Sequence, residues 1–165
     1  MWTILKINKK NLKTLKTDLY NKLGKDVKFY IPKIQIKKSF KKKVFTKEVS
    51  LLNDYLLCFH KDFSKKSVLT SLKYCRGLKY FLSDFFSSQK EIENFIFKCK
   101  KNETESGYIQ PSFFEHKKNG SYEFISGPFA SFIFNIFKEN KLSMFGMMGN
   151  YKITVSKNNY FLKTV

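Results

Sequence analysis

The sequence contains Leu51-Leu52-Asn53-Asp54-Tyr55-Leu56-Leu57-Cys58-Phe59, a polar turn that leads into a nearly continuous apolar run. An apolar run without polar alternation is typical of a strand that is covered on both faces. We therefore predict a central strand of a sheet at the end of this stretch.

The residues before this strand predict a long hairpin. Apolar residues alternate over residues 27–36, and Pro32 interrupts the alternation, which indicates an edge strand or a bulge. A basic run follows over residues 37–43, and apolar residues return at 44–46. The expected hairpin thus has a basic tip.

Helices and strands surround the central strand. The predicted elements are a strand over residues 2–7, a helix over 12–23 that stops at Gly24, a short helix that opens at Ser67, a strand over 78–82, and a helix over 88–99 that starts with a capping box of Ser88 and Glu91. Together they predict a domain over residues 1–102.

The character of the sequence changes after this domain. Residues 103–119 are mostly polar and are typical of an interdomain linker. Over residues 120–165, short strand-like runs alternate with Gly, Asn and Ser turns, which predicts a small β-barrel.

The charge is strongly basic and uneven. The 165 residues carry 32 Lys+Arg and 13 Asp+Glu, a net charge of +19. Residues 1–102 carry 25 Lys+Arg and 8 Asp+Glu, or +17, whereas residues 103–165 carry 7 and 5, or +2. Such a field attracts nucleic acid or an anionic membrane surface. The sequence has no apolar stretch long enough to span a membrane, so we expect a cytoplasmic protein that does not enter the membrane.

Residues for catalysis or metal binding are sparse. The acidic residues are scattered, His60 and His116 stand apart from any metal-type spacing, and the three cysteines form no Cys-x-x-Cys pair. We expect His60, beside Lys61 and Asp62 at a strand end, to lie at the surface. The prediction is a binding protein with reduced thiols that is not an enzyme and carries no cofactor or metal.

Five short motifs follow one another in an order similar to that of a known family. They are Trp2-Thr3-Ile4-Leu5, Phe29-Tyr30-Ile31-Pro32-Lys33, Leu51-Leu52-Asn53-Asp54-Tyr55-Leu56, Arg76-Gly77-Leu78 with Phe81, and Ile125-Ser126-Gly127-Pro128-Phe129-Ala130-Ser131-Phe132. Through them the chain resembles the NusG family of transcription elongation factors along essentially its whole length. The fifth is similar to the signature of the family's KOW module.

The resemblance implies an α+β fold, with an N-terminal α/β domain of the NGN type, a linker and a KOW-type β-barrel. It also implies binding to RNA polymerase, whose clamp helices sit in an apolar depression of the NGN domain. Tyr55, Leu52 and Phe81 map onto that depression, although aromatic residues on strands are usually core. The further polymerase contacts that it implies are Ser67, Thr70 and Ser71. Asn53-Asp54 stands where the family has Pro-Gly or Pro-Asn.

The C-terminal tail and Arg76-Gly77 resemble the specialised RfaH-type paralogues, which implies a factor that suppresses pausing or termination. Arg76 lies where this resemblance implies a contact with exposed non-template DNA, and the alternative is a salt bridge to a local carboxylate. The supporting basic residues are Lys9, Lys10 and Lys73 near Arg76, and Lys41, Lys42 and Lys43 at the hairpin tip, where upstream DNA could bind.

The KOW module has its own predicted partners. Met148-Gly149-Asn150 replaces the Phe-Gly-Arg turn through which general factors contact a small-subunit ribosomal protein, so Met148 and Asn150 are the candidates for binding that protein or Rho. Residues 129–137 satisfy both a helical and a strand period, as RfaH-type refolding would require. Because Gly146, Gly149 and a β-branched run over 153–155 disfavour a helix, we expect the barrel.

Two other functions remain open at this point. A KOW-containing ribosomal or other RNA-binding protein would also be basic, and an enzyme acting on nucleic acid is a third alternative. For the elongation factor we expect a monomer.

Overall fold

The computed structural model describes residues 1–40, 43–114, 120–125 and 127–165, and the chain forms two compact units. The first unit comprises residues 1–32 and 50–98, and the second comprises residues 33–49 and 99–165.

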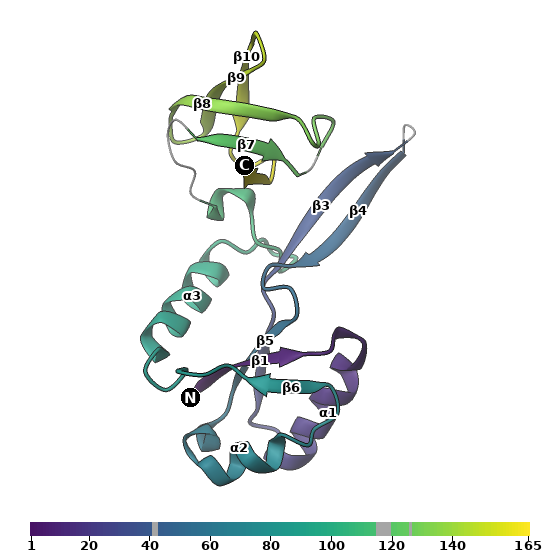
Figure 1. The fold of residues 1–165 in the computed structure, drawn as a ribbon, viewed down its shortest axis with the longest axis vertical. Coiled ribbons are helices and arrows are strands. Elements are labelled where there is room, and N and C mark those ends of the chain that lie inside the picture. The colour runs from purple at the N-terminus through teal and green to yellow at the C-terminus, as the bar shows by residue number, and fades with distance from the viewer. Residues whose placement is uncertain (41–42, 115–119, 126) are drawn as a thin grey trace. The chain divides into compact units, whose positions relative to one another are not determined.

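A four-stranded antiparallel sheet organises the first unit (Figure 1). Its strands are β2 (Lys28–Tyr30), β5 (Tyr55–Phe59), β1 (Trp2–Ile7) and β6 (Leu78–Phe81), in that spatial order. In β5, Leu56, Leu57 and Cys58 are all buried. The prediction of an inner strand covered on both faces is therefore confirmed.

Helices pack on both faces of this sheet. On one face, α1 (Leu12–Leu23), the 3-10 helix η2 (Lys61–Ser64) and α2 (Lys66–Leu72) contribute Leu15, Leu19, Phe63 and Leu72 to a core that also holds Leu5, Leu56 and Cys58. On the other face, α3 (Gln89–Lys101) packs Ile92 and Ile96 against Leu57 and Phe85. The alternation of β5 side chains thus serves two separate cores.

The hairpin differs from its prediction at Pro32. The alternation over residues 27–36 does not form one strand, because the chain changes partner at this residue: β2 pairs with β5, whereas β3 (Lys33–Phe40) pairs with β4 (Lys43–Ser50). A proline cannot donate a ladder hydrogen bond, which suits the point where one pairing ends. Lys41 and Lys42, which belong to the predicted basic tip, lie outside the described residues.

In the second unit, the segment after α3 lies along the base of the hairpin. The Ile109 amide donates to the Lys33 carbonyl at 2.7 Å, and Ile109 is buried. Glu48 accepts a hydrogen bond from the Tyr108 hydroxyl at 2.9 Å and pairs with Lys33 at 2.8 Å. Part of the predicted linker is therefore packed, because it contains an apolar residue that finds a buried position. The domain boundaries at 102 and 119 stay a prediction.

The C-terminal part of the second unit is a five-stranded antiparallel sheet. The strands are β10 (Tyr151–Ser156), β9 (Ser143–Met148), β8 (Ile133–Glu139), β7 (Ser121–Phe124) and β11 (Leu162–Thr164), in that spatial order. The rings of Phe124 and Phe134 stack with their centroids 4.5 Å apart in its core. Residues 133–137 lie in β8 and none of residues 129–137 is helical, as expected for the barrel form. The α+β fold class is confirmed.

Candidate functional site

Three side chains form a row across the sheet of the first unit. Lys6 of β1 is paired with Tyr55 of β5 on one side and with Tyr80 of β6 on the other. Side chains of paired residues point to the same face of a sheet, so all three lie on the face that α3 partly covers. We call Tyr55, Lys6 and Tyr80 the Tyr-Lys-Tyr row.

The centre of this row is an ion pair. Lys6 Nζ lies 2.7 Å from Asp54 Oδ1 and 4.2 Å from the centroid of the Tyr55 ring. The hydrogen bond between the two residues raises the pKa of Lys6 and lowers the pKa of Asp54. A hydrogen bond with Tyr55 raises the pKa of the Tyr80 phenol. The row therefore presents two phenols around a paired ammonium group.

The predicted polymerase contacts divide between the two faces. Leu52 packs partly against the core beneath α3, and Tyr55 is half-buried on the same face. Phe81 instead packs against the other core, with its ring edge on Phe63. Its partner in the register is Leu5, which is fully buried on that face. Tyr80, which is 49% exposed, stands beside Tyr55 where Phe81 was expected.

Tyr80 could not be found from the local sequence. The motif singles out Phe81, and only the pairing of Lys6 with Tyr80 shows which of the two neighbours faces Tyr55. Ser67, Thr70 and Ser71, the other predicted contacts, are exposed on α2.

A second group surrounds the turn between α2 and β6. Asn8 donates from its backbone amide to the Gly77 carbonyl at 2.8 Å, which brings the 3-10 helix η1 (Lys9–Asn11) beside this turn. A side chain at Gly77 would place its Cβ 2.7 Å from Asn11 Cβ, and Gly77 has a φ of 90°. The close approach explains why Arg76 is followed by glycine.

Arg76 and its aromatic neighbour point into solvent. The Arg76 side chain is 76% exposed, and its Nε lies 3.7 Å from Asp18 Oδ2, a distance that leaves room for other partners. Tyr74 is 84% exposed, between the buried residues Leu72 and Cys75. The segment Lys73-Tyr74-Cys75-Arg76 carries a signal that points to Tyr74: an aromatic residue between cations, as in single-strand binding surfaces.

The predicted lysines fall into three groups. Lys10 and Lys73 are exposed beside the Arg76 turn and at the end of α2. Lys9 donates from Nζ to Asn53 Oδ1 at 2.6 Å, so its ammonium already has a partner. Lys41 and Lys42 lie outside the described residues, as does the side chain of Lys43.

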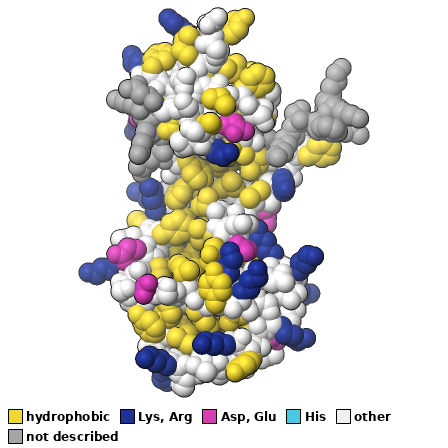
Figure 2. All heavy atoms as spheres, in the orientation of Figure 1, with side chains coloured by type: hydrophobic (Ala, Val, Ile, Leu, Met, Phe, Trp, Pro, Cys, Tyr) yellow, Lys and Arg dark blue, Asp and Glu magenta, His cyan; other side chains and the backbone are white. Residues whose placement is uncertain are grey.

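Figure 2 shows hydrophobic side chains gathered on the visible face of the first unit, with Lys and Arg side chains scattered around them.

The predicted contacts of the second unit lie at one hairpin. Met148 ends β9, and Gly149 and Asn150 form the two-residue turn that leads into β10. Met148 packs partly against the core of the C-terminal sheet, whereas Asn150 is exposed. Their role in binding a partner stays a prediction.

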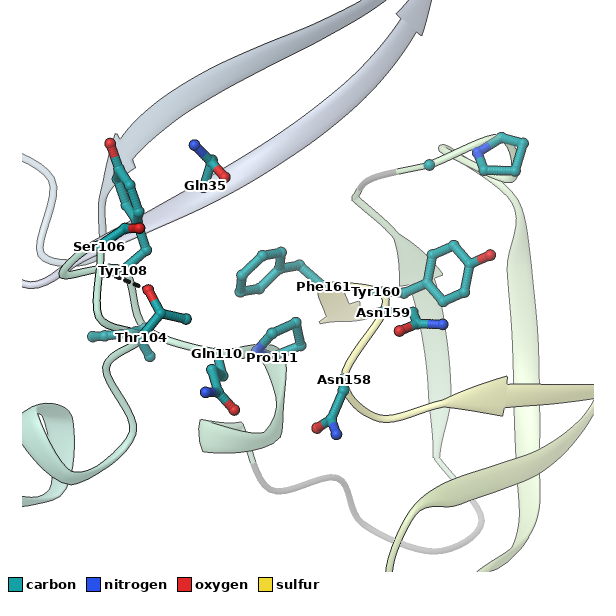
Figure 3. Close-up of a pocket in the computed structure, with 13 residues that line it drawn as sticks. Gln35, Thr104, Ser106, Tyr108, Gln110, Pro111, Asn158, Asn159, Tyr160 and Phe161 are labelled. Atoms are coloured by element: carbon teal, nitrogen blue, oxygen red, sulfur yellow. Dashed lines mark hydrogen bonds between the residues drawn. The ribbon is translucent and has the colours of Figure 1, made fainter.

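A groove of about 760 Å³ lies in the second unit (Figure 3). Its described lining is uncharged, with amides from Gln35, Gln110, Asn158 and Asn159 and the rings of Tyr160 and Phe161. These groups can donate and accept hydrogen bonds, but they supply no carboxylate or amine for proton transfer.

His60 is buried rather than at the surface as predicted. It is 2% exposed because its ring packs against Phe63, and its Nδ1 accepts from the Asp62 amide at 3.2 Å as the N-cap of η2. His116 lies outside the described residues. Among the described residues, no group of three or more His, Cys, Asp or Glu could hold a metal ion, and no helix is long and apolar enough to cross a membrane.

No family model matches this chain, and no curated protein matches its sequence. Among solved structures, the chain is similar to one titled as the crystal structure of an MjSpt4:Spt5 complex in conformation B, with 16% identity and a TM-score of 0.33 over 100% of this chain and 97% of that chain. It is also similar to a structure titled as domain interaction in Thermotoga maritima NusG, with 11% identity and a TM-score of 0.37 over 99% and 96% of the two chains. Overlaps at this level assign neither a family nor a function by themselves.

Proposed function

We propose that this protein binds RNA polymerase and acts as a transcription elongation factor in the cytoplasm. The observation that carries the proposal is the Tyr-Lys-Tyr row, because it contains Tyr55, the residue that the family resemblance maps onto a polymerase-binding depression. A protein interface is commonly anchored by a few aromatic residues, and tyrosine is among the most frequent. In this proposal the partner is the pair of clamp helices of the largest subunit.

The finer proposal is a specialised factor of the RfaH type, which suppresses pausing or termination. Its support is the turn that carries Tyr74 and Arg76, where an exposed ring and an exposed guanidinium are separated by one residue in the sequence, on a basic unit. Aromatic rings and guanidinium groups both stack on unpaired bases. The proposed ligand of this turn is the non-template DNA strand that an elongating polymerase exposes.

The binding experiment uses the full chain and purified RNA polymerase. Tyr55→Ala should weaken the complex by about 2 kcal/mol, as the loss of an interface anchor does. As a control, Tyr151→Ala removes a tyrosine of β10 that is 75% exposed and should leave binding unchanged.

Two results would reject the proposal. Equal binding by folded wild type and Tyr55→Ala would remove Tyr55 from the interface. Retention of ribosomal subunits without RNA polymerase would favour the ribosomal or RNA-binding alternative.

A further inference from the structure

We infer that Lys6 and Asp54 are positioning residues for Tyr55: the Asp54 carboxylate holds the Lys6 ammonium over the Tyr55 ring and so keeps the ring in place for its partner. The inference rests on the proposed function, since it gives these two residues a role in the polymerase contact of Tyr55.

The contacts of Lys6 carry the first step. Its Nζ lies 2.7 Å from Asp54 Oδ1 and 4.2 Å from the Tyr55 ring centroid, so one ammonium group meets a carboxylate and a ring face at once. A lysine on an open sheet face would ordinarily extend into water. Here the Lys6 side chain is 21% exposed and that of Asp54 is 23% exposed.

The backbone of the turn carries the second step. The Asp54 carbonyl accepts from the Ile7 amide at 2.9 Å, and the Tyr55 amide donates to the Leu52 carbonyl at 3.1 Å. Asn53 has a φ of 52°, in the left-handed region, and its side chain accepts from Lys9 Nζ at 2.6 Å. Both turn residues that precede Tyr55 are therefore hydrogen-bonded to lysines: Asp54 to Lys6 of β1, and Asn53 to Lys9 of η1.

The third step concerns the cost of binding. An exposed side chain that is free to rotate loses conformational entropy when a partner immobilises it, and a side chain already held in place loses less. A cation over an aromatic face attracts the ring through its quadrupole. Lys6 thus reduces the conformational entropy that Tyr55 loses when it binds. Asp54 contributes to this effect because its carboxylate holds the Lys6 ammonium in place.

The arrangement can be measured without a partner. In wild type, the ring current of Tyr55 should shift the Lys6 ε-methylene protons upfield in the NMR spectrum. Both Tyr55→Leu and Asp54→Ala should move these resonances downfield, toward those of exposed lysines. Lys13→Met, which removes an exposed lysine of α1 on the opposite face, should leave them unchanged.

The role in binding is tested by a double-mutant cycle with RNA polymerase. Binding should weaken roughly threefold to tenfold in Lys6→Met and in Asp54→Ala. Lys6→Arg, which keeps the positive charge, should retain most of the wild-type affinity. Lys13→Met should have no effect. In a Tyr55→Ala background, Asp54→Ala should have no further effect, because no ring remains to be positioned.

The outcomes separate the inference from the function on which it rests. If Tyr55→Ala weakens binding while Lys6→Met and Asp54→Ala do not, or if their losses add fully to that of Tyr55→Ala, the positioning role is wrong and the proposed function stands. An unmoved Lys6 resonance in Asp54→Ala also overturns the inference. If wild type does not bind polymerase, the proposed function fails, and the positioning role at this interface fails with it.

Discussion

At Gly77 an added methyl group would both strain the backbone and clash with Asn11. The φ of Gly77 is 90°, and a Cβ would lie 2.7 Å from Asn11 Cβ and 3.1 Å from the Asn11 carbonyl oxygen. Gly24 has a similar φ of 86° with nothing within 4 Å of its would-be Cβ. An alanine at either position would strain the backbone, but only the alanine at position 77 would also overpack its surroundings.

We therefore expect Gly77→Ala to lower the free energy of unfolding by about 1–3 kcal/mol more than Gly24→Ala does. Urea unfolding followed by the fluorescence of Trp2, the one tryptophan of the chain, reports on the first unit. Equal midpoints for the two variants would mean that the Asn11 contact gives way without cost.

Arg76→Lys tests how the guanidinium is used. Lysine keeps the charge but cannot stack or form two parallel hydrogen bonds, so base contact predicts a loss on one DNA sequence and little loss on a scrambled one. Fluorescence anisotropy with two labelled single strands measures this. A uniform loss on both strands would mean phosphate contact alone, and unchanged binding would leave Arg76 to its ion pair with Asp18.

At the scale of elements, the sequence pattern predicts those strands and helices whose bounds depend on neighbouring residues alone. The strand over residues 2–7 and the helix over 12–23 were predicted at their observed bounds, since alternation defines one and Gly24 ends the other. The exchange of partners at Pro32 and the pairing of Lys6 with Tyr80 were not predicted, because they depend on register between distant strands. For the same reason the local motif does not show that Tyr80, and not Phe81, shares the face of Tyr55.

Gly146 makes the all-β form of the C-terminal sheet testable. In β9 its Cα faces the Phe134 ring and the Asn135 carbonyl, and a Cβ would lie 2.8 Å and 2.7 Å from atoms of these residues. Gly146→Ala should therefore disrupt the sheet, although alanine favours a helix by about 1 kcal/mol over glycine. We expect circular dichroism to show lost structure without a gain in helix. A rise in helical signal would show instead that this segment can refold.

For the whole molecule, acid sensitivity follows from its carboxylates. Hydrogen bonds to Lys6, Lys65 and Lys33 lower the pKa values of Asp54, Asp62 and Glu48 respectively. A carboxyl whose pKa is lower in the folded chain stabilises it at neutral pH, and this contribution is lost as the pH falls through the folded pKa. We therefore expect the free energy of unfolding to decrease as the pH is lowered from about 4.

Asp54→Asn provides the check. It should be less stable than wild type at pH 7, and the difference should shrink as the pH falls from 4 to 2, since protonation removes the same charge from wild type. Chemical unfolding at four or five pH values measures this. A constant difference across that range would show that the ion pair with Lys6 does not contribute to stability.

The hydrogen bond from the Arg76 amide to Asp18 Oδ2, at 3.1 Å, uses the main chain and not the side chain. Together with Gly77 against Asn11, it holds the turn by atoms that every residue other than proline possesses at position 76. Exchanging the side chain there removes the 3.7 Å ion pair with Asp18 but keeps both of these contacts. Under the proposed DNA contact, position 76 is a suitable place for a saturation library, because variants selected on new DNA sequences would then differ in recognition while sharing one scaffold.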